Sequence, residues 1–176
     1  MTTIRRSTAG ELIHLQSIEL AAGALFREIG MTDVAGHPPP SIETLERYRQ
    51  AALAWTAAGP DDQAIGYVLV DLVDGAAHIE QVSVHPDHGR QGIGRLLIDE
   101  VDSWAAGRGL PALTLSTFRN VPWNAPYYAR LGFLELAAGE LTPGLIEVQR
   151  HEAALGLDPA QRLFMRREIG TDSVRG

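Results

Sequence analysis

Three glycines and two arginines lie close together in the stretch Gly89-Arg90-Gln91-Gly92-Ile93-Gly94-Arg95. The apolar residues before this stretch predict a strand, and the apolar periodicity of residues 93–104 predicts an amphipathic helix. A helix N-terminus offers unpaired N–H groups and positive dipole charge, and glycines let the backbone approach an anion closely. The stretch is therefore predicted to bind phosphate groups, with charge-assisted contacts from Arg90 and Arg95.

Other kinds of phosphate-binding loop fit these residues less well. A Walker A loop has Lys-Ser/Thr after its last glycine, whereas Gly94 is followed by Arg95-Leu96. A dinucleotide-binding loop has Gly-x-Gly-x-x-Gly, whereas the spacing here is Gly-x-x-Gly-x-Gly and Leu97 occupies the last place. Glycines that serve only a tight turn remain the structural alternative.

Two motifs of this chain resemble those of the GNAT superfamily of acyl-CoA N-acyltransferases. In that family a Val-x-Val-x-Pro strand end, as in residues 82–86, leads into (Gln/Arg)-x-x-Gly-x-(Gly/Ala), whose amides hold the coenzyme A pyrophosphate. Gly92 and Gly94 match this motif, and Gly89 stands where the family usually has Gln or Arg. The second motif, in residues 123–133, is similar to the family's helix that ends in Tyr-x-x-x-Gly-Phe. By element order the resemblance covers about residues 2–168.

The resemblance implies an N-acetyltransferase that moves the acetyl group of acetyl-CoA to a primary amine by direct attack in a ternary complex. Glu80 is the expected general base, since a carboxylate at the strand end can deprotonate an alkylammonium. His78, two residues away and so on the same strand face, is the alternative base. Tyr128 is the expected general acid. The residues expected to bind the cofactor are Val82, Ser83, Val84, Gly89, Arg90, Gln91, Gly92, Ile93, Gly94, Arg95, Asn124 and Tyr128.

Composition limits the kind of partner and the kind of chemistry. The 176 residues carry 15 basic and 22 acidic side chains, a net charge of −7, which argues against nucleic acid or an anionic membrane as partner. The chain has no cysteine, which excludes disulfides and an acyl-cysteine route, and we expect no metal. No segment has the roughly 20 apolar residues of a membrane span, so a cytoplasmic protein is expected. The expected partner is a small-molecule or peptide amine, and the resemblance also allows a homodimer.

The order of predicted elements favours an α+β fold, with a mixed, mostly antiparallel central sheet flanked by helices. This is the GNAT, or acyl-CoA N-acyltransferase, fold, in a single domain over residues 1–176. Strands are expected at 2–6, 53–57, 64–73, 77–84, 112–117, 133–137 and 162–167. Helices are expected to begin near Thr8, Ser41, Ile93, Asn124 and Pro143, with loops between them that include 30–40. The arginines of the last strand are expected to be exposed.

Two other functions remain open at this stage. A catalytically inactive acyl-CoA-binding sensor would have the same loop but would not depend on Glu80. A nucleotide-binding α/β module would bind ATP or NAD in preference to acetyl-CoA.

Overall fold

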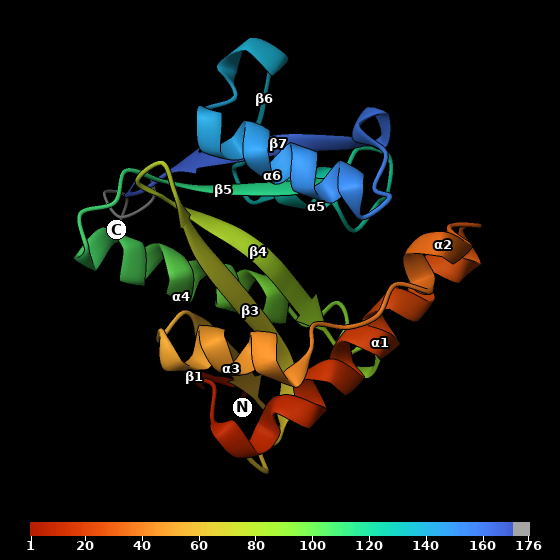
Figure 1. Cartoon of the computed structure of the whole chain (residues 1–176). Coiled ribbons are helices and arrows are strands. Elements are labelled where there is room, and N and C mark those ends of the chain that lie inside the picture. The colour runs from red at the N-terminus through yellow and green to blue at the C-terminus, as the bar shows by residue number, and fades with distance from the viewer. Residues whose placement is uncertain (171–176) are drawn as a thin grey trace. The chain divides into compact units, whose positions relative to one another are not determined.

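The computed structural model describes residues 1–170, which form seven strands and six α-helices (Figure 1). The strands are β1 (Thr3–Arg6), β2 (Ala54–Ala58), β3 (Ala64–Val73), β4 (Ala76–Val84), β5 (Ala112–Phe118), β6 (Leu134–Leu136) and β7 (Arg162–Glu168). The α-helices are α1 (Leu12–Glu28), α2 (Thr32–Ala35), α3 (Ile42–Gln50), α4 (Ile93–Gly107), α5 (Ala125–Arg130) and α6 (Pro143–Ala154). Short 3-10 helices lie at Ala9–Glu11, Pro86–His88, Ala138–Glu140 and Pro159–Gln161. No helix in this described range is long and apolar enough to cross a membrane.

The strands form one mixed sheet in the order β1-β2-β3-β4-β5-β7-β6. The pairs β1–β2, β2–β3, β5–β7 and β6–β7 are antiparallel, whereas β4 and β5 run parallel. The predicted mixed, mostly antiparallel sheet flanked by helices is therefore confirmed.

Local sequence explains several of the element boundaries. Asp74 and Gly75 both have positive φ, 49° and 79°, as a two-residue hairpin turn between β3 and β4 requires. Ser41 caps α3 by accepting a hydrogen bond from the Thr44 N–H at 3.1 Å. The loop expected at 30–40 is partly wrong, because it contains the short helix α2.

The chain folds into two compact units. Unit 1 comprises residues 1–70 and 81–100, and unit 2 comprises residues 71–80 and the chain from 101 onward. The chain passes from one unit to the other within β3, β4 and α4. The expected single domain over 1–176 stays a prediction, and its last residues, 171–176, lie outside the described part.

The core of unit 1 forms where α1 and α3 cover β2 and β3. Its buried members are Leu12, Leu15, Ile18, Leu45, Ala54, Tyr67 and Leu69. On α1 the first three of these recur at helical spacing, so burial of this stripe fixes which face of α1 meets the sheet.

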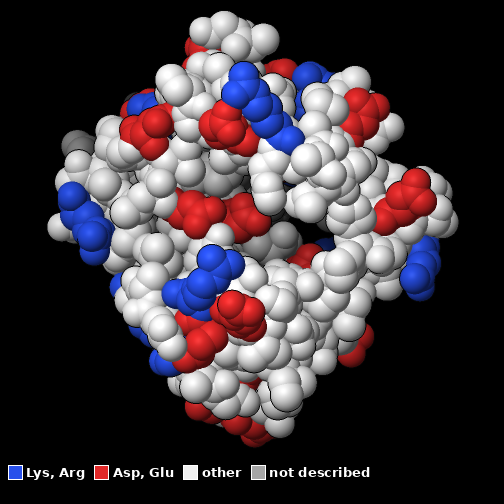
Figure 2. Space-filling view, viewed as in Figure 1, with Lys and Arg blue, Asp and Glu red and all other residues white. Residues whose placement is uncertain are grey.

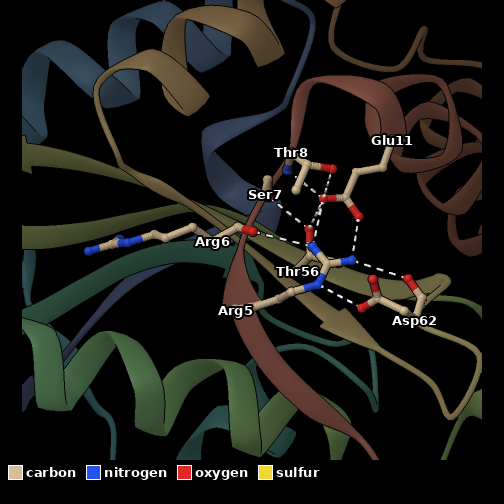
Figure 3. Close-up of polar contacts among 7 residues, drawn as sticks. All are labelled: Arg5, Arg6, Ser7, Thr8, Glu11, Thr56 and Asp62. Atoms are coloured by element: carbon tan, nitrogen blue, oxygen red, sulfur yellow. Dashed lines mark hydrogen bonds and ion pairs between the residues drawn. The ribbon is translucent and has the colours of Figure 1, made fainter.

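A polar network anchors the start of α1 to the strands of unit 1 (Figure 3). The guanidinium of Arg5 lies between Glu11, at 2.9 and 3.1 Å, and Asp62, at 2.9 Å. Glu11 also accepts hydrogen bonds from the N–H of Thr8 at 2.5 Å and the hydroxyl of Thr56 at 3.2 Å. Burial alone would raise the pKa of Glu11, but the bonds from Arg5 and Thr8 outweigh it and lower that pKa. Glu11 thus stays charged, and its hydrogen bonds connect β1 and β2 to the N-terminal end of α1.

In unit 2, carboxylates of α6 and α4 hold two arginines of β7 in partly buried ion pairs. The Arg162 side chain is 12% exposed and pairs with Glu152 at 3.1 Å, and both contact the hydroxyl of Ser116. The Arg167 side chain is 11% exposed and pairs with Asp102 of α4 at 2.9 Å. The expectation of exposed arginines in this strand is therefore wrong, because carboxylates from distant helices cover two of them.

Candidate active site

The predicted phosphate-binding loop lies wholly in unit 1 and ends in the long helix α4. Gly92 has φ of +74°, and Arg90 also adopts a left-handed conformation with φ of +60°. The hydrogen bond from the Leu96 N–H to the Gly92 carbonyl, at 3.1 Å, begins the helix ladder. The N–H groups of residues 93–95 therefore have no intrahelical acceptor and lie at the positive, N-terminal end of the helix dipole.

Close packing fixes this loop against the sheet. A Cβ placed on Gly66 of β3 would lie 3.0 Å from the Ser83 carbonyl oxygen and 3.4 Å from Cγ2 of Ile93. Ile93 is only 2% exposed, and the His85 N–H donates to the Ile65 carbonyl at 2.9 Å. Glycine at position 66 thus allows β3, β4 and the first residue of α4 to meet.

The surface of the loop fits a diphosphate. Arg90, Gln91 and Arg95 are exposed, and a Cβ on Gly92 would meet nothing within 4 Å. Arg95 lies 3.7 Å from Asp99, an exposed pair of little strength that leaves the guanidinium accessible. At Gly89 an added Cβ would lie 3.2 Å from the Pro86 carbonyl, which gives a steric reason for glycine where the resemblance expects Gln or Arg. Amides at a helix N-terminus with two nearby guanidinium groups suit the pyrophosphate of acetyl-CoA.

Next to the loop, the Ser83 side chain connects β4 to α1. Its hydroxyl donates to Glu19 of α1 at 2.5 Å and accepts from the Gln81 side chain at 2.8 Å. The hydroxyl of Tyr67 on β3 donates to the same Glu19 oxygen at 2.8 Å. Ser83 was predicted to bind the cofactor. Its hydrogen bond brings the carboxylate of Glu19, which was not identified from the sequence, next to the loop.

The two candidate bases on β4, both in unit 2, lie in different environments. His78 is 2% exposed, its Nδ1 lies 2.9 Å from the Thr114 hydroxyl, and its ring lies 6.5 Å from that of Phe164. Burial lowers the pKa of His78 to about 4, so the imidazole is neutral at neutral pH and enclosed. Glu80 is exposed. Accessibility therefore favours Glu80 over His78 as the base.

Tyr128 lies on α5 of unit 2 between two other rings. The centroid of its ring lies 5.3 Å from that of Tyr127 and 6.0 Å from that of Phe133, both in edge-to-face geometry. Burial raises the pKa of Tyr128 well above its ordinary value, Tyr127 adds to this, and Arg162 opposes it. The phenol is consequently protonated throughout the neutral range.

The hydroxyl of Tyr128 has no partner within residues 1–170 that would compete for its proton. It forms no hydrogen bond with the residues of the described part, where no buried side-chain oxygen or nitrogen lacks a partner. A protonated phenol whose hydroxyl is not engaged by another side chain can donate to a leaving group.

Asn124 lies at the start of α5 and connects this helix to β5. Its side chain forms no cap bond to α5 and instead accepts from the Thr117 hydroxyl at 2.7 Å. Its backbone carbonyl accepts from the Tyr128 N–H at 3.0 Å. Asn124 thus connects β5 to the helix that carries Tyr128.

The expected site residues are divided between the units. Unit 1 contains the loop and Val82, Ser83 and Val84, whereas unit 2 contains Glu80, Asn124 and Tyr128. Glu19 could have been noticed in the sequence, because it interrupts the apolar stripe formed by Leu12, Leu15 and Ala22. The partners that hold it, however, are 48 and 64 residues away.

Charge on the face of the molecule drawn in Figure 2 is mixed. On the face drawn in Figure 2, basic side chains occur as separate groups among acidic and uncharged ones. Among the described residues of this face they form no continuous basic surface, the feature on which binding to a phosphate backbone depends.

Solved structures of acetyltransferases share this fold. An acetyltransferase of the GNAT family from Staphylococcus aureus Mu50 has a TM-score of 0.74 at 15% identity, over 96% of this chain and 99% of that one. PaiA N-acetyltransferase from Thermoplasma acidophilum, solved in complex with coenzyme A, has a TM-score of 0.69 at 14% identity, over 96% and 99%. The predicted acyl-CoA N-acyltransferase fold is therefore confirmed.

Sequence similarity establishes the family. Residues 23–133 match the acetyltransferase (GNAT) family, and since this is more than half of the chain, the protein belongs to that family. Mycothiol acetyltransferase of Nocardiopsis dassonvillei is 33% identical over 103 residues, which cover 51% of this chain and 31% of that protein. The chain thus spans about a third of that relative's length. The predicted membership of the GNAT superfamily is therefore confirmed.

Proposed function

We propose that this protein transfers the acetyl group of acetyl-CoA to a primary amine by direct attack, with Glu80 as general base and Tyr128 as general acid. The observation that carries the proposal is the glycine loop at the N-terminus of α4, within a chain that belongs to the GNAT family. Family membership supports acetyl-CoA as the donor. The left-handed conformation of Gly92, next to the unpaired amides of the α4 N-terminus, supports binding of the donor's pyrophosphate at this loop.

The reaction needs one proton removed and one supplied. Glu80 takes a proton from the acceptor ammonium, and the neutral nitrogen then attacks the thioester carbonyl carbon. The new C–N bond forms, the C–S bond breaks, and the leaving thiolate takes a proton from the Tyr128 hydroxyl. The extra N–H proton of the acylated nitrogen passes to solvent, and backbone N–H groups of the Val82 region polarise the thioester oxygen.

The cofactor is tested first, by thermal unfolding with acetyl-CoA, CoA, ATP and NAD, each far above its dissociation constant. A ligand at about 100 times its Kd stabilises the folded state by about 2.7 kcal/mol. We expect stabilisation by acetyl-CoA and CoA alone. Stabilisation by ATP or NAD without either CoA species would overturn the proposal.

The base is tested by thiol release from acetyl-CoA with a panel of amines. We expect Glu80→Gln to lower kcat by roughly 100-fold while leaving the CoA-induced thermal shift intact. Glu28→Gln, an exposed carboxylate at the end of α1, is the matched control. Unchanged turnover in Glu80→Gln would refute the role of Glu80, and CoA binding without thiol release from the unmodified protein would favour a sensor.

A further inference from the structure

Glu19 is an acidic residue at a position where the helix pattern requires an apolar one. It lies between Leu15, which is fully buried, and Ala22 along the stripe of α1 that covers the sheet. A carboxylate at the edge of a core loses hydration and needs partners that replace the lost water. The nature of these partners indicates what the carboxylate can bind.

Only neutral groups hold the Glu19 carboxylate. Its Oε2 accepts from the hydroxyls of Ser83, at 2.5 Å, and Tyr67, at 2.8 Å. Both donors are buried, Ser83 at 6% and Tyr67 at 0% exposure, and Gln81 fixes the Ser83 hydroxyl from behind. Two rigid donors thus orient the carboxylate but leave its negative charge uncompensated.

The other oxygen, Oε1, is open. Within residues 1–170 it receives no hydrogen bond, and Glu19 forms no ion pair. Since no buried side-chain oxygen of those residues lacks a partner, Oε1 must have access to solvent. Glu19 therefore presents one fixed and accessible carboxylate oxygen.

Glu19 and the cofactor-binding elements belong to the same compact unit. Ser83, which anchors it, directly follows Val82, whose amide region is expected to polarise the thioester, and both precede the glycine loop. A cation held at Oε1 would be next to β4, the strand on which the acyl group is expected.

We propose that Oε1 of Glu19 binds the ammonium group of the acceptor, so that the acceptor is an amine that arrives positively charged. This inference rests on the proposed acetyl transfer. An ammonium N–H donates to Oε1, and the charge-assisted bond supplies the compensation that the hydroxyls of Ser83 and Tyr67 do not. Glu19 then selects cationic amines.

The experiment compares two kinds of nucleophile in the same thiol-release assay. Tyramine, spermidine and an alanine-initiated tetrapeptide are the cationic acceptors, and methoxyamine is an amine that is uncharged at neutral pH. In Glu19→Gln we expect the KM of the cationic acceptor to rise roughly 10- to 100-fold, with a nearly unchanged rate for methoxyamine. The chain has no lysine, so acetylation of its own side-chain amines contributes no background.

Matched variants separate binding from folding. Glu28→Gln makes the same charge change on the same helix and should leave KM unaltered. Ser83→Ala keeps the Glu19 charge but removes its 2.5 Å anchor, and we expect a smaller rise in KM. Glu19→Gln and Glu28→Gln should keep the CoA-induced thermal shift of the unmodified protein.

The outcomes distinguish this inference from the proposed function. An unchanged KM for the cationic acceptor in Glu19→Gln, or an equal loss with methoxyamine, overturns the role of Glu19 while acetyl transfer stands. Turnover of methoxyamine but of none of the cationic amines also overturns it. No thiol release from the unmodified protein with any of the four nucleophiles overturns both.

Discussion

Glu11 in unit 1 lies among hydrogen-bond donors, whereas burial dominates the surroundings of His78 and Tyr128 in unit 2. In unit 1, the pKa of Glu11 is lowered because the effect of the hydrogen bonds from Arg5 and Thr8 exceeds the opposite effect of burial. In unit 2, burial is the main cause of the lowered pKa of His78 and the raised pKa of Tyr128. The surroundings of Glu11 therefore stabilise a charged form, and those of His78 and Tyr128 stabilise neutral forms.

This difference agrees with the proposed division of tasks. A region that binds a diphosphate and an ammonium needs fixed charges and dipoles, which hydrogen bonds keep in place. A proton donor must instead be protonated before the reaction, and a phenol meets this condition at neutral pH. The following predictions test this comparison.

The largest expected effect comes from removing the central carboxylate of the network in Figure 3. Glu11→Ala leaves Arg5 partly buried without its main partner, which typically costs about 3–5 kcal/mol in free energy of unfolding. We expect the Tm to fall by on the order of 10 °C in thermal unfolding. Asp62→Ala removes the other, exposed partner of Arg5 and should cost less than about 1 kcal/mol. Equal losses in the two variants would contradict the importance of the buried carboxylate.

The next effect tests proton donation from unit 2. Tyr128→Phe keeps the ring contacts with Tyr127 and Phe133 but removes the hydroxyl. We expect kcat to fall roughly 100-fold, with little change in the Kd of CoA or in Tm. Tyr127→Phe is the control on the same helix and should retain activity. A Tyr128→Phe enzyme with full kcat would assign the tyrosine to packing alone.

The third prediction tests the cofactor loop of unit 1. In Gly92→Ala, residue 92 must either adopt φ near +74° with a side chain, which costs about 1–2 kcal/mol, or change the backbone conformation of the loop. We expect the Kd of CoA to rise at least roughly 10-fold by calorimetry, since strain of this size corresponds to about that factor. Gly10→Ala, where an added Cβ meets nothing within 4 Å and φ is not positive, should leave the Kd unaltered. Normal CoA affinity in Gly92→Ala would show that the loop binds by another geometry.

The smallest effect concerns the pH dependence of stability. The pKa of His78 is about 4 in the folded state against 6.5 for an ordinary histidine, so the unfolded chain binds more protons between these values. The free energy of unfolding therefore decreases as pH falls through 6.5 toward 4, by about 1 kcal/mol between pH 7 and 5.5 from this group. Denaturant unfolding at the two pH values should show a smaller decrease in His78→Gln. An identical decrease in this variant would mean that His78 is not enclosed.

The sequence alone determined the features that depend on neighbouring residues. The Asp74-Gly75 turn, the Ser41 cap and the glycine loop before α4 all lie where the sequence predicted them. Such signals act through the backbone of a few adjacent residues, so their energetics are already contained in a short segment. These signals were sufficient to predict the fold class and the family.

Tertiary structure decided which polar side chains are buried and what holds them. Arg162 and Arg167 resembled exposed residues, yet carboxylates 10 and 65 residues away cover them. His78 and Glu80 are two positions apart on β4, so the sequence placed them on the same strand face. Only His78 is buried, next to Thr114 and Phe164. Glu19 acquired its open oxygen only because Tyr67 and Ser83 hold the other one. Burial and hydrogen bonding of a side chain depend on segments that meet only after folding, so the spacing of residues cannot reveal them.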